Sequence, residues 1–136
     1  MDPVVHFEMP AEDKERMKKF YESVFGWQTQ QLGDDMGSYV VVTTSETDEK
    51  RMIKEPGRIN GGFYQKTDDP LTHGTSVVIA VQDIAEASQK IKNAGGTVIG
   101  GSKKDGTPDD IPGVGLYASF IDTEGNRVTI LQPKGM

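Results

Sequence analysis

The chain has 136 residues, a formal charge of −6 and no cysteine. This length suits one domain and is short for two, and the lack of cysteine excludes disulfides, zinc–thiolate sites and thiol nucleophiles and fits a reducing compartment. The acidic balance argues against nucleic acid as a partner, because it repels the phosphate backbone. No apolar run approaches the ~20 residues of a membrane span, and the first residues do not resemble a signal peptide. We therefore expect a cytoplasmic protein without membrane contact.

The first half of the sequence predicts a strand, a helix and three more strands. Apolar and polar residues alternate over residues 4–9, which predicts a strand that Pro10 ends. Acidic residues then lead into a helix over residues 14–24, and Gly26 is its expected stop. The helix carries one apolar stripe, formed by Met17, Phe20, Tyr21 and Val24. The three strands are expected at residues 27–32, 38–44 and 59–65, with a turn at 33–35 and a polar loop at 45–58.

After a linker at residues 66–74, the same order of elements recurs. A strand is predicted at residues 75–81, followed by a helix over 84–94 with Asp83 as its N-cap. The inner face of this helix is expected to hold Ile84, Ala87, Ile91 and Ala94. The remaining strands are expected at residues 97–100, 116–121 and 127–132, with a Gly/Pro/Asp-rich loop at 103–115 and a turn at 122–126.

The two halves align without gaps over their first part when they are shifted by seventy residues, which places His6 on Ser76 and Asp13 on Asp83. Any two strand–helix units could align in this way, but the recurrence of all five elements in order favours a true repeat. One half cannot bury both its helix stripe and the concave side of its sheet. We therefore predict an α+β fold, with two tandem βαβββ modules at about residues 1–66 and 75–136 of a single domain. The modules would form a curved eight-stranded mixed sheet with helices outside and a central trough, a usual place for a small-molecule site.

Several motifs resemble one superfamily. Residues 6–10 and the Phe-Tyr to Gly-Trp segment at 20–27 look like the first strand and helix of vicinal-oxygen-chelate proteins, the glyoxalase, bleomycin-resistance and extradiol-dioxygenase superfamily. Residues 111–115 and the Asp-x-x-Gly-Asn turn within 120–126 resemble the loop and hairpin before the family's last strand. The likeness is to members described as enzymes related to lactoylglutathione lyase, and it implies the two-module fold. Phe20 and Tyr21 would anchor the helix to the sheet.

The resemblance also implies where a metal would bind. In metal-using members, the first and last strands of each half supply four inward ligands, typically His, Gln or Glu. Those positions here are His6, Gly62, Ser76 and Thr129, with Gly62 dependent on the register of the fourth strand. Only His6 is a usual ligand, whereas catalytic sites usually have three protein ligands and hydroxyls bind transition metals weakly. We therefore expect no metal and no cofactor, although Glu8 on the same face could add a second ligand.

Each candidate site residue has a functional and a structural interpretation. His6 could be a pocket base or a ligand contact, or simply a hydrogen-bonded histidine. Glu8 could orient His6 or act with it in catalysis, or be a solvated carboxylate. Ser76, Tyr117 and Thr129 could hydrogen-bond a ligand, but Thr is also a good strand former and Tyr117 could pack at a subunit contact.

Three hypotheses follow for function. The first is a metal-independent protein that binds a small molecule in the trough, like the drug-sequestering members of the superfamily. The second is an enzyme of lyase, isomerase or dioxygenase-related type, in which His6 or Glu8 abstracts a proton next to a carbonyl. The third is a non-catalytic assembly module. A homodimer is expected from the resemblance alone.

Overall fold

The computed structural model describes residues 1–135, and the chain divides into two compact units. The first unit is His6–Thr75. The second unit is Ser76–Met136 together with Met1–Val5. The N-terminal residues join the second unit because the backbone N–H of Ala80 donates to the carbonyl of Pro3, at 3.0 Å. Among the described residues, no helix is long and apolar enough to cross a membrane.

The first unit has the predicted order of elements. Its elements are β1 (Val4–Ala11), α1 (Lys14–Phe25), β2 (Gln28–Gln31), β3 (Val40–Thr43) and β4 (Asn60–Gln65), with a short 3-10 helix at Asp34–Met36. The strands are hydrogen-bonded in the order β2-β3-β4-β1, with β1 parallel to β4 and the other pairs antiparallel. Contrary to expectation, β1 runs past Pro10 to Ala11. Proline ends a strand only where its missing N–H is needed.

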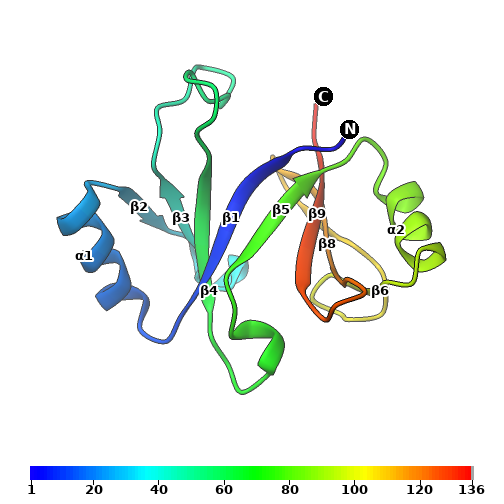
Figure 1. Ribbon diagram of the computed structural model, residues 1–136. Coiled ribbons are helices and arrows are strands. Elements are labelled where there is room, and N and C mark those ends of the chain that lie inside the picture. The colour runs from blue at the N-terminus through cyan, green and yellow to red at the C-terminus, as the bar shows by residue number, and fades with distance from the viewer. Residues whose placement is uncertain (136) are drawn as a thin grey trace. The chain divides into compact units, whose positions relative to one another are not determined.

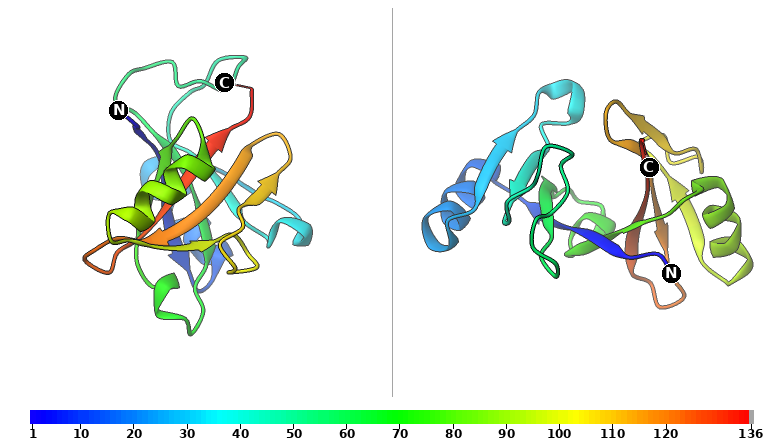
Figure 2. Two further views of the ribbon diagram at one scale, coloured as in Figure 1. Left: turned by 90° about the vertical axis from the view of Figure 1, so that its right-hand side faces the viewer. Right: turned by 90° about the horizontal axis from the view of Figure 1, so that it is seen from above.

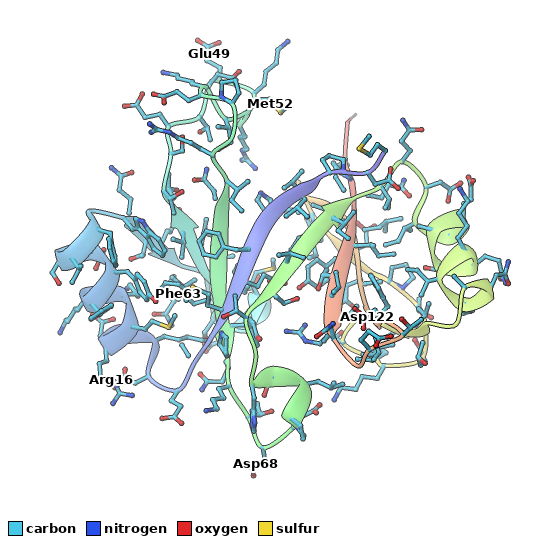
Figure 3. All side chains as sticks on the ribbon, viewed as in Figure 1. Arg16, Glu49, Met52, Phe63, Asp68 and Asp122 are labelled. Atoms are coloured by element: carbon cyan, nitrogen blue, oxygen red, sulfur yellow. The ribbon has the colours of Figure 1, made fainter. Side chains whose placement is uncertain are left out.

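Helix α1 lies on one face of this sheet (Figure 1). The Asp13 side chain caps its first turn, and Gly26 ends it in the left-handed region at φ 73°. Met17 and Tyr21 pack against a core that includes Phe63 of β4, which points toward α1 in Figure 3. The indole of Trp27 stacks on Tyr21 at 4.6 Å between ring centroids.

The predicted stripe of α1 was too wide. Phe20 is 54% exposed and Val24 is 55% exposed, so neither anchors the helix. Only Met17 and Tyr21, which lie one turn apart, face the sheet, and Trp27 covers the remaining core surface on that side.

The second unit repeats this plan with one additional strand. Its elements are β5 (Ser76–Ala80), α2 (Ile84–Asn93), β6 (Thr97–Gly100), β7 (Asp109–Ile111), β8 (Gly115–Ile121) and β9 (Arg127–Pro133). The order is β5-β9-β8-β6, with β5 parallel to β9, and β7 also pairs with β8. Strand β7 falls inside the expected loop at 103–115. Two aspartates in three residues gave no strand signal, because Asp has low strand propensity.

Helix α2 lies across the strands of its own unit (Figure 2). Asp83 caps it as predicted, by accepting from the backbone N–H of Glu86 at 3.1 Å. Ile84 is buried, and Ala87 and Ile91 pack on the core that contains Ala118 and Ile130. Ala94 is the C-cap and is exposed, so it does not belong to the inner face.

The register of the strands confirms that the two halves are repeats. Glu8 is opposite Gly62 in the β1–β4 pair, and Val78 is opposite Thr129 in the β5–β9 pair. Because Val78 lies seventy residues after Glu8, the same two positions face each other in both units. The α+β fold of two βαβββ modules and the equivalence of Gly62 with Thr129 are therefore confirmed. The trough and the single-domain span stay predictions.

Candidate functional site

The face of the first sheet that α1 leaves uncovered carries both candidate catalytic residues. Phe7 and Met9 pack into the core beneath α1. Since side chains alternate along a strand, His6 and Glu8 point to the opposite face. Glu8 is only 3% exposed, which is unusual for a carboxylate and requires hydrogen-bonding partners.

One partner of Glu8 is Tyr39, whose hydroxyl donates to the carboxylate at 2.9 Å. The phenol ring lies directly over Gly62, and a side-chain carbon at Gly62 would overlap both the ring and the hydroxyl. Glycine at this position therefore makes the room that Tyr39 occupies. The ring of Tyr39 occupies the space that a larger side chain at position 62 would need.

The segment before β3 holds Tyr39 in place. Its carbonyl accepts from the backbone N–H of Leu32, at 2.8 Å. The preceding residue, Ser38, has a left-handed backbone at φ 53°, and its carbonyl accepts from the ammonium of Lys14 at 2.9 Å. Lys14 of α1 thus holds the turn that positions the Tyr39 phenol next to Glu8.

The surroundings of His6 lower the pKa of its imidazole. Desolvation by the surrounding protein lowers the pKa of His6 below its ordinary value, and the nearby Glu8 carboxylate opposes this only in part. A neutral imidazole can accept a proton or a hydrogen bond at neutral pH. The first unit therefore places an imidazole with a lowered pKa next to the buried Glu8 side chain.

The uncovered face of the second sheet is also polar. Ser119 and Thr129 alternate with Ala118 and Ile130, which pack under α2, so both hydroxyls point away from the helix. Their oxygens are 3.3 Å apart and both residues are buried. The guanidinium of Arg127 donates to Ser119 at 3.5 Å. Thr129 donates to the phenol of Tyr117, also at 3.5 Å.

Comparison with known proteins finds similarity to bleomycin resistance-like and glyoxylase-like proteins. The family model for the bleomycin resistance protein-like N-terminal region matches residues 4–45, the segment that holds His6, Glu8 and Tyr39. A glyoxylase-like domain-containing protein of Didymella fabae is 28% identical over 130 residues, covering 94% of this chain and 91% of that one. The chain is thus similar to bleomycin resistance-like proteins over residues 4–45 and to a glyoxylase-like protein over most of its length.

Solved structures share the fold of this protein. A variant of Streptomyces coelicolor methylmalonyl-CoA epimerase in complex with 2-nitronate-propionyl-CoA matches with a TM-score of 0.68 at 12% identity, covering 98% of this chain and 96% of that one. A glyoxalase/bleomycin resistance protein/dioxygenase superfamily member from Vibrio splendidus matches with a TM-score of 0.59 at 15% identity, covering 97% and 99%. At these sequence identities, the similarity shows a shared fold and gives no information about the activity of this chain.

The residues at the superfamily's metal positions do not fit a divalent metal. Gly62 supplies no ligand, and the phenol of Tyr39 fills its surroundings. Ser76 donates its hydroxyl to the backbone carbonyl of Arg127 at 2.8 Å, and Thr129 is fully buried among other hydroxyls. Only His6 has a usual ligand type, and within residues 1–135 no group of three or more Asp, Glu or His side chains gathers to hold a metal.

The structure thus groups the predicted site residues unit by unit. His6, Glu8 and Gly62 share the uncovered face of the first sheet, whereas Tyr117 and Thr129 share that of the second. Ser76 is buried at the start of β5. Outside both groups, the His73 ring bonds the carbonyl of Thr67 at 2.6 Å in the linker.

Three residues escaped sequence analysis, namely Tyr39, Ser119 and Arg127. Ser119 and Arg127 each lie two positions from a residue that was predicted, Tyr117 and Thr129. The alternation of a strand could therefore have found both. Tyr39 had no comparable signal, because it precedes β3 and its partner Glu8 is distant in the sequence.

A surface hollow lies elsewhere in the first unit. It has a volume of about 450 Å³ and an apolar floor that includes Met17 and Tyr21. Its rim is charged, with Glu12 within 3.9 Å of Arg16 and 3.5 Å of Lys66. None of the predicted site residues lines this hollow, so it is separate from the candidate site on the uncovered face.

Proposed function

We propose that this protein binds a small organic molecule on the sheet faces left uncovered by its helices, without the metal of the superfamily's metal-using members. The observation that carries the proposal is the Tyr39–Glu8 hydrogen bond built over Gly62. The phenol of Tyr39 occupies the space beside Gly62, where metal-using members would have a ligand side chain, and the carboxylate of Glu8 accepts its hydrogen bond.

The distribution of buried polar groups supports a binding role. The covered faces of the two sheets hold apolar cores. Several polar residues are nevertheless buried, namely Glu8, Ser76, Ser119 and Thr129. The alternation of side chains along the strands places Glu8, Ser119 and Thr129 on the uncovered faces. Burying a polar group costs about 1–3 kcal/mol unless it is hydrogen-bonded. Complexes of structurally similar proteins with small molecules, such as 2-nitronate-propionyl-CoA, agree with this role.

The test combines metal analysis with ligand screening. The untagged protein is purified for metal content and titrated with nickel, zinc, manganese and iron(II) while its melting temperature is measured. We expect no stoichiometric metal and no shift, whereas a small uncharged or amphipathic compound at a hundredfold excess over its Kd should stabilise the fold by about 2.7 kcal/mol. Stoichiometric metal, or stabilisation by metals alone, would refute the proposal.

A second candidate function rests on His6, whose pKa is lowered, beside Glu8 on the uncovered face of the first sheet. This pair could abstract a proton next to a carbonyl, as in an isomerase or lyase of lactoylglutathione-lyase type. The variant His6→Ala should then lose turnover of a substrate while keeping its far-UV spectrum, and His73→Ala, a histidine of the linker, should keep activity. Full activity in the His6 variant would remove this function.

The quaternary structure is proposed from the resemblance. We propose a cytoplasmic homodimer, which light scattering after size exclusion would show as twice the 14.9 kDa of one chain. A module that serves assembly alone would give a dimer and no stabilisation by any compound in the screen.

A further inference from the structure

Strand β2 is the edge strand of the first unit, because within residues 1–135 it is hydrogen-bonded to β3 alone. We propose that the other side of β2, called the free side below, pairs with β2 of a second copy of this chain, antiparallel and about a two-fold axis at Gln30. The inference rests on the homodimer proposed above and names the interface that forms it. It makes no use of the bound small molecule.

The ladder between β2 and β3 fixes which backbone groups reach the free side. The backbone N–H of Leu32 donates to the carbonyl of Tyr39 at 2.8 Å, so these two residues form a hydrogen-bonded pair. Hydrogen-bonded and non-hydrogen-bonded pairs alternate along an antiparallel ladder. Gln30 is therefore bonded to β3 as well, whereas the N–H and C=O groups of Thr29 and Gln31 point to the free side.

A two-fold axis at Gln30 uses all of these outward groups. It places Thr29 of each copy opposite Gln31 of the other, and each such pair exchanges two N–H···O bonds. Gln30 then lies opposite its own copy. An axis at Thr29 or at Gln31 would pair that residue with itself and leave the other opposite a residue outside β2. The pairing also closes at two chains, because it consumes the free side of both copies.

The composition of β2 favours pairing with a second copy of itself. Edge strands are normally blocked by charged residues, proline or bulges. Strand β2 has the sequence Gln-Thr-Gln-Gln, which contains neither a charge nor a proline, and its register with β3 is uninterrupted. Like charges directly opposite each other destabilise a strand pair, and a two-fold axis brings residues near it close to their own copies. In a chain with a net charge of −6, a neutral strand lets two copies meet without this repulsion.

The edge strand of the second unit, β6, has the protection that β2 lacks. Its register with β8 shifts between Val98 and Gly100, and Gly100 has a left-handed backbone at φ 95°. The loop that follows folds back on the strand, because the backbone N–H of Gly106 donates to the carbonyl of Ile99 at 3.0 Å. A bulge and a covering loop are two of the usual ways to prevent edge pairing. The chain thus blocks the edge at β6 and leaves the edge at β2 open.

Exposed apolar side chains lie beside the open edge. The hydroxyl of Thr29 donates to the carboxylate of Glu22 at 3.0 Å, which places the last turns of α1 next to β2. Val24 and Phe25 in these turns are 55% and 60% exposed. The ring of Phe25 is 6.0 Å from that of Trp27, the residue that leads into β2. Because both copies of α1 would flank the new strand pair on the same face, the second copy would cover part of this apolar surface.

The experiment uses the lack of native cysteine, because a single introduced thiol then reports on one position. In the full-length variant Gln30→Cys, the two copies of residue 30 form a non-hydrogen-bonded pair with Cα atoms about 4.5 Å apart, which a disulfide can bridge. Gln28→Cys is the matched control, exposed on the same strand, but its two copies would be about 13 Å apart along the strands. Under mild oxidation, we expect on the order of tenfold more covalent dimer from Gln30→Cys than from Gln28→Cys in non-reducing gels.

Charge variants test the same axis without a covalent bond. Gln30→Lys places like charges opposite each other and should raise the dimer Kd, measured by sedimentation equilibrium, by about fivefold. An equimolar mixture of Gln30→Lys and Gln30→Glu should reverse this loss, which a folding defect would not allow. Gln89→Lys makes the same change on an exposed position of α2 and should leave the Kd unchanged.

The outcomes separate this inference from the proposals on which it rests. A dimer that cross-links equally through residues 28 and 30, or whose Kd ignores the charge at position 30, overturns the pairing of β2 and leaves the homodimer standing. A chain that is monomeric at every concentration overturns both. Neither result bears on binding of a small molecule, which the ligand screen tests separately.

Discussion

Replacing Gly62 by alanine should destabilise the protein far more than a glycine-to-alanine change normally does. A methyl group at this position would overlap the ring and hydroxyl of Tyr39. The backbone at Gly62 cannot yield easily, because β4 is hydrogen-bonded to strands on both sides. The phenol must therefore move, and its hydrogen bond to Glu8 would lengthen or break.

The expected cost is the balance of three contributions. Overpacking a buried position costs about 1–3 kcal/mol. Loss of a hydrogen bond to a buried charged group costs about 1.5–3 kcal/mol. Against these, alanine restricts the unfolded chain and returns about 0.4–1 kcal/mol. Partial movement of the ring should leave a net loss of about 3 kcal/mol, which lowers the melting temperature by on the order of 10 °C for a chain of this length.

The measurement is urea denaturation followed by far-UV circular dichroism, arranged as a double-mutant cycle. In the background Tyr39→Ala, the methyl group at position 62 has room, and Gly62→Ala should cost less than about 0.5 kcal/mol. Gly74→Ala is the matched control, because no atom lies within 4 Å of the added carbon. Similar costs for the two glycine variants, or a cost at Gly62 that persists without Tyr39, would refute the packing argument.

Three further predictions concern other contacts. Desolvation lowers the pKa of His6 in the folded protein. Below the ordinary pKa of 6.5, the unfolded chain therefore binds more protons than the folded protein does. The free energy of unfolding should fall as the pH drops through this range. His6→Gln should show a flatter melting temperature over this range, and parallel curves would contradict the assignment. Asn60 accepts from the backbone N–H groups of Thr44 and Ser45 at 2.8 and 2.9 Å; Asn60→Ala should cost about 1–2 kcal/mol in urea and speed tryptic cleavage of the loop at 45–58. Asp83→Ala should cost about 1 kcal/mol by removing the cap of α2, whereas Asp83→Asn should retain most of it, and equal melting temperatures for the two would exclude the cap as the cause.

The loop at 45–58 illustrates what local sequence determines well. Its polar composition predicted an irregular segment, and it contains only an isolated bridge between Thr47 and Ile53. Figure 3 shows Glu49 and Met52 at its tip, away from the sheet. Helix ends were equally predictable, since the caps at Asp13 and Asp83 and the stop at Gly26 depend on residues within one turn. Failures such as Phe20 arose where packing on the sheet, which is not a local property, decides burial.

The part of the candidate site that could be predicted is the part that follows from the alternation of side chains along a strand. Alternation placed His6 and Glu8 on one face, and the repeat gave the correct register for Gly62. The sequence alone showed glycine there only as a missing ligand. Its second role, as the space for a phenol, depends on Tyr39, which lies 23 residues earlier and reaches Gly62 only through the pairing of β3 with β4.

The two units use one backbone plan for opposite chemistry. The uncovered face of the first unit holds the imidazole of His6, whose pKa is lowered, and the carboxylate of Glu8. In the second unit, Val78 takes the position of Glu8, and the hydroxyls of Ser119 and Thr129 lie on the uncovered face. A divalent transition metal prefers imidazole, carboxylate or thiolate ligands to neutral hydroxyls. The second repeat has Ser76 and Thr129 at the positions where the resemblance places metal ligands, so its hydroxyls offer weaker ligands than imidazole or carboxylate would.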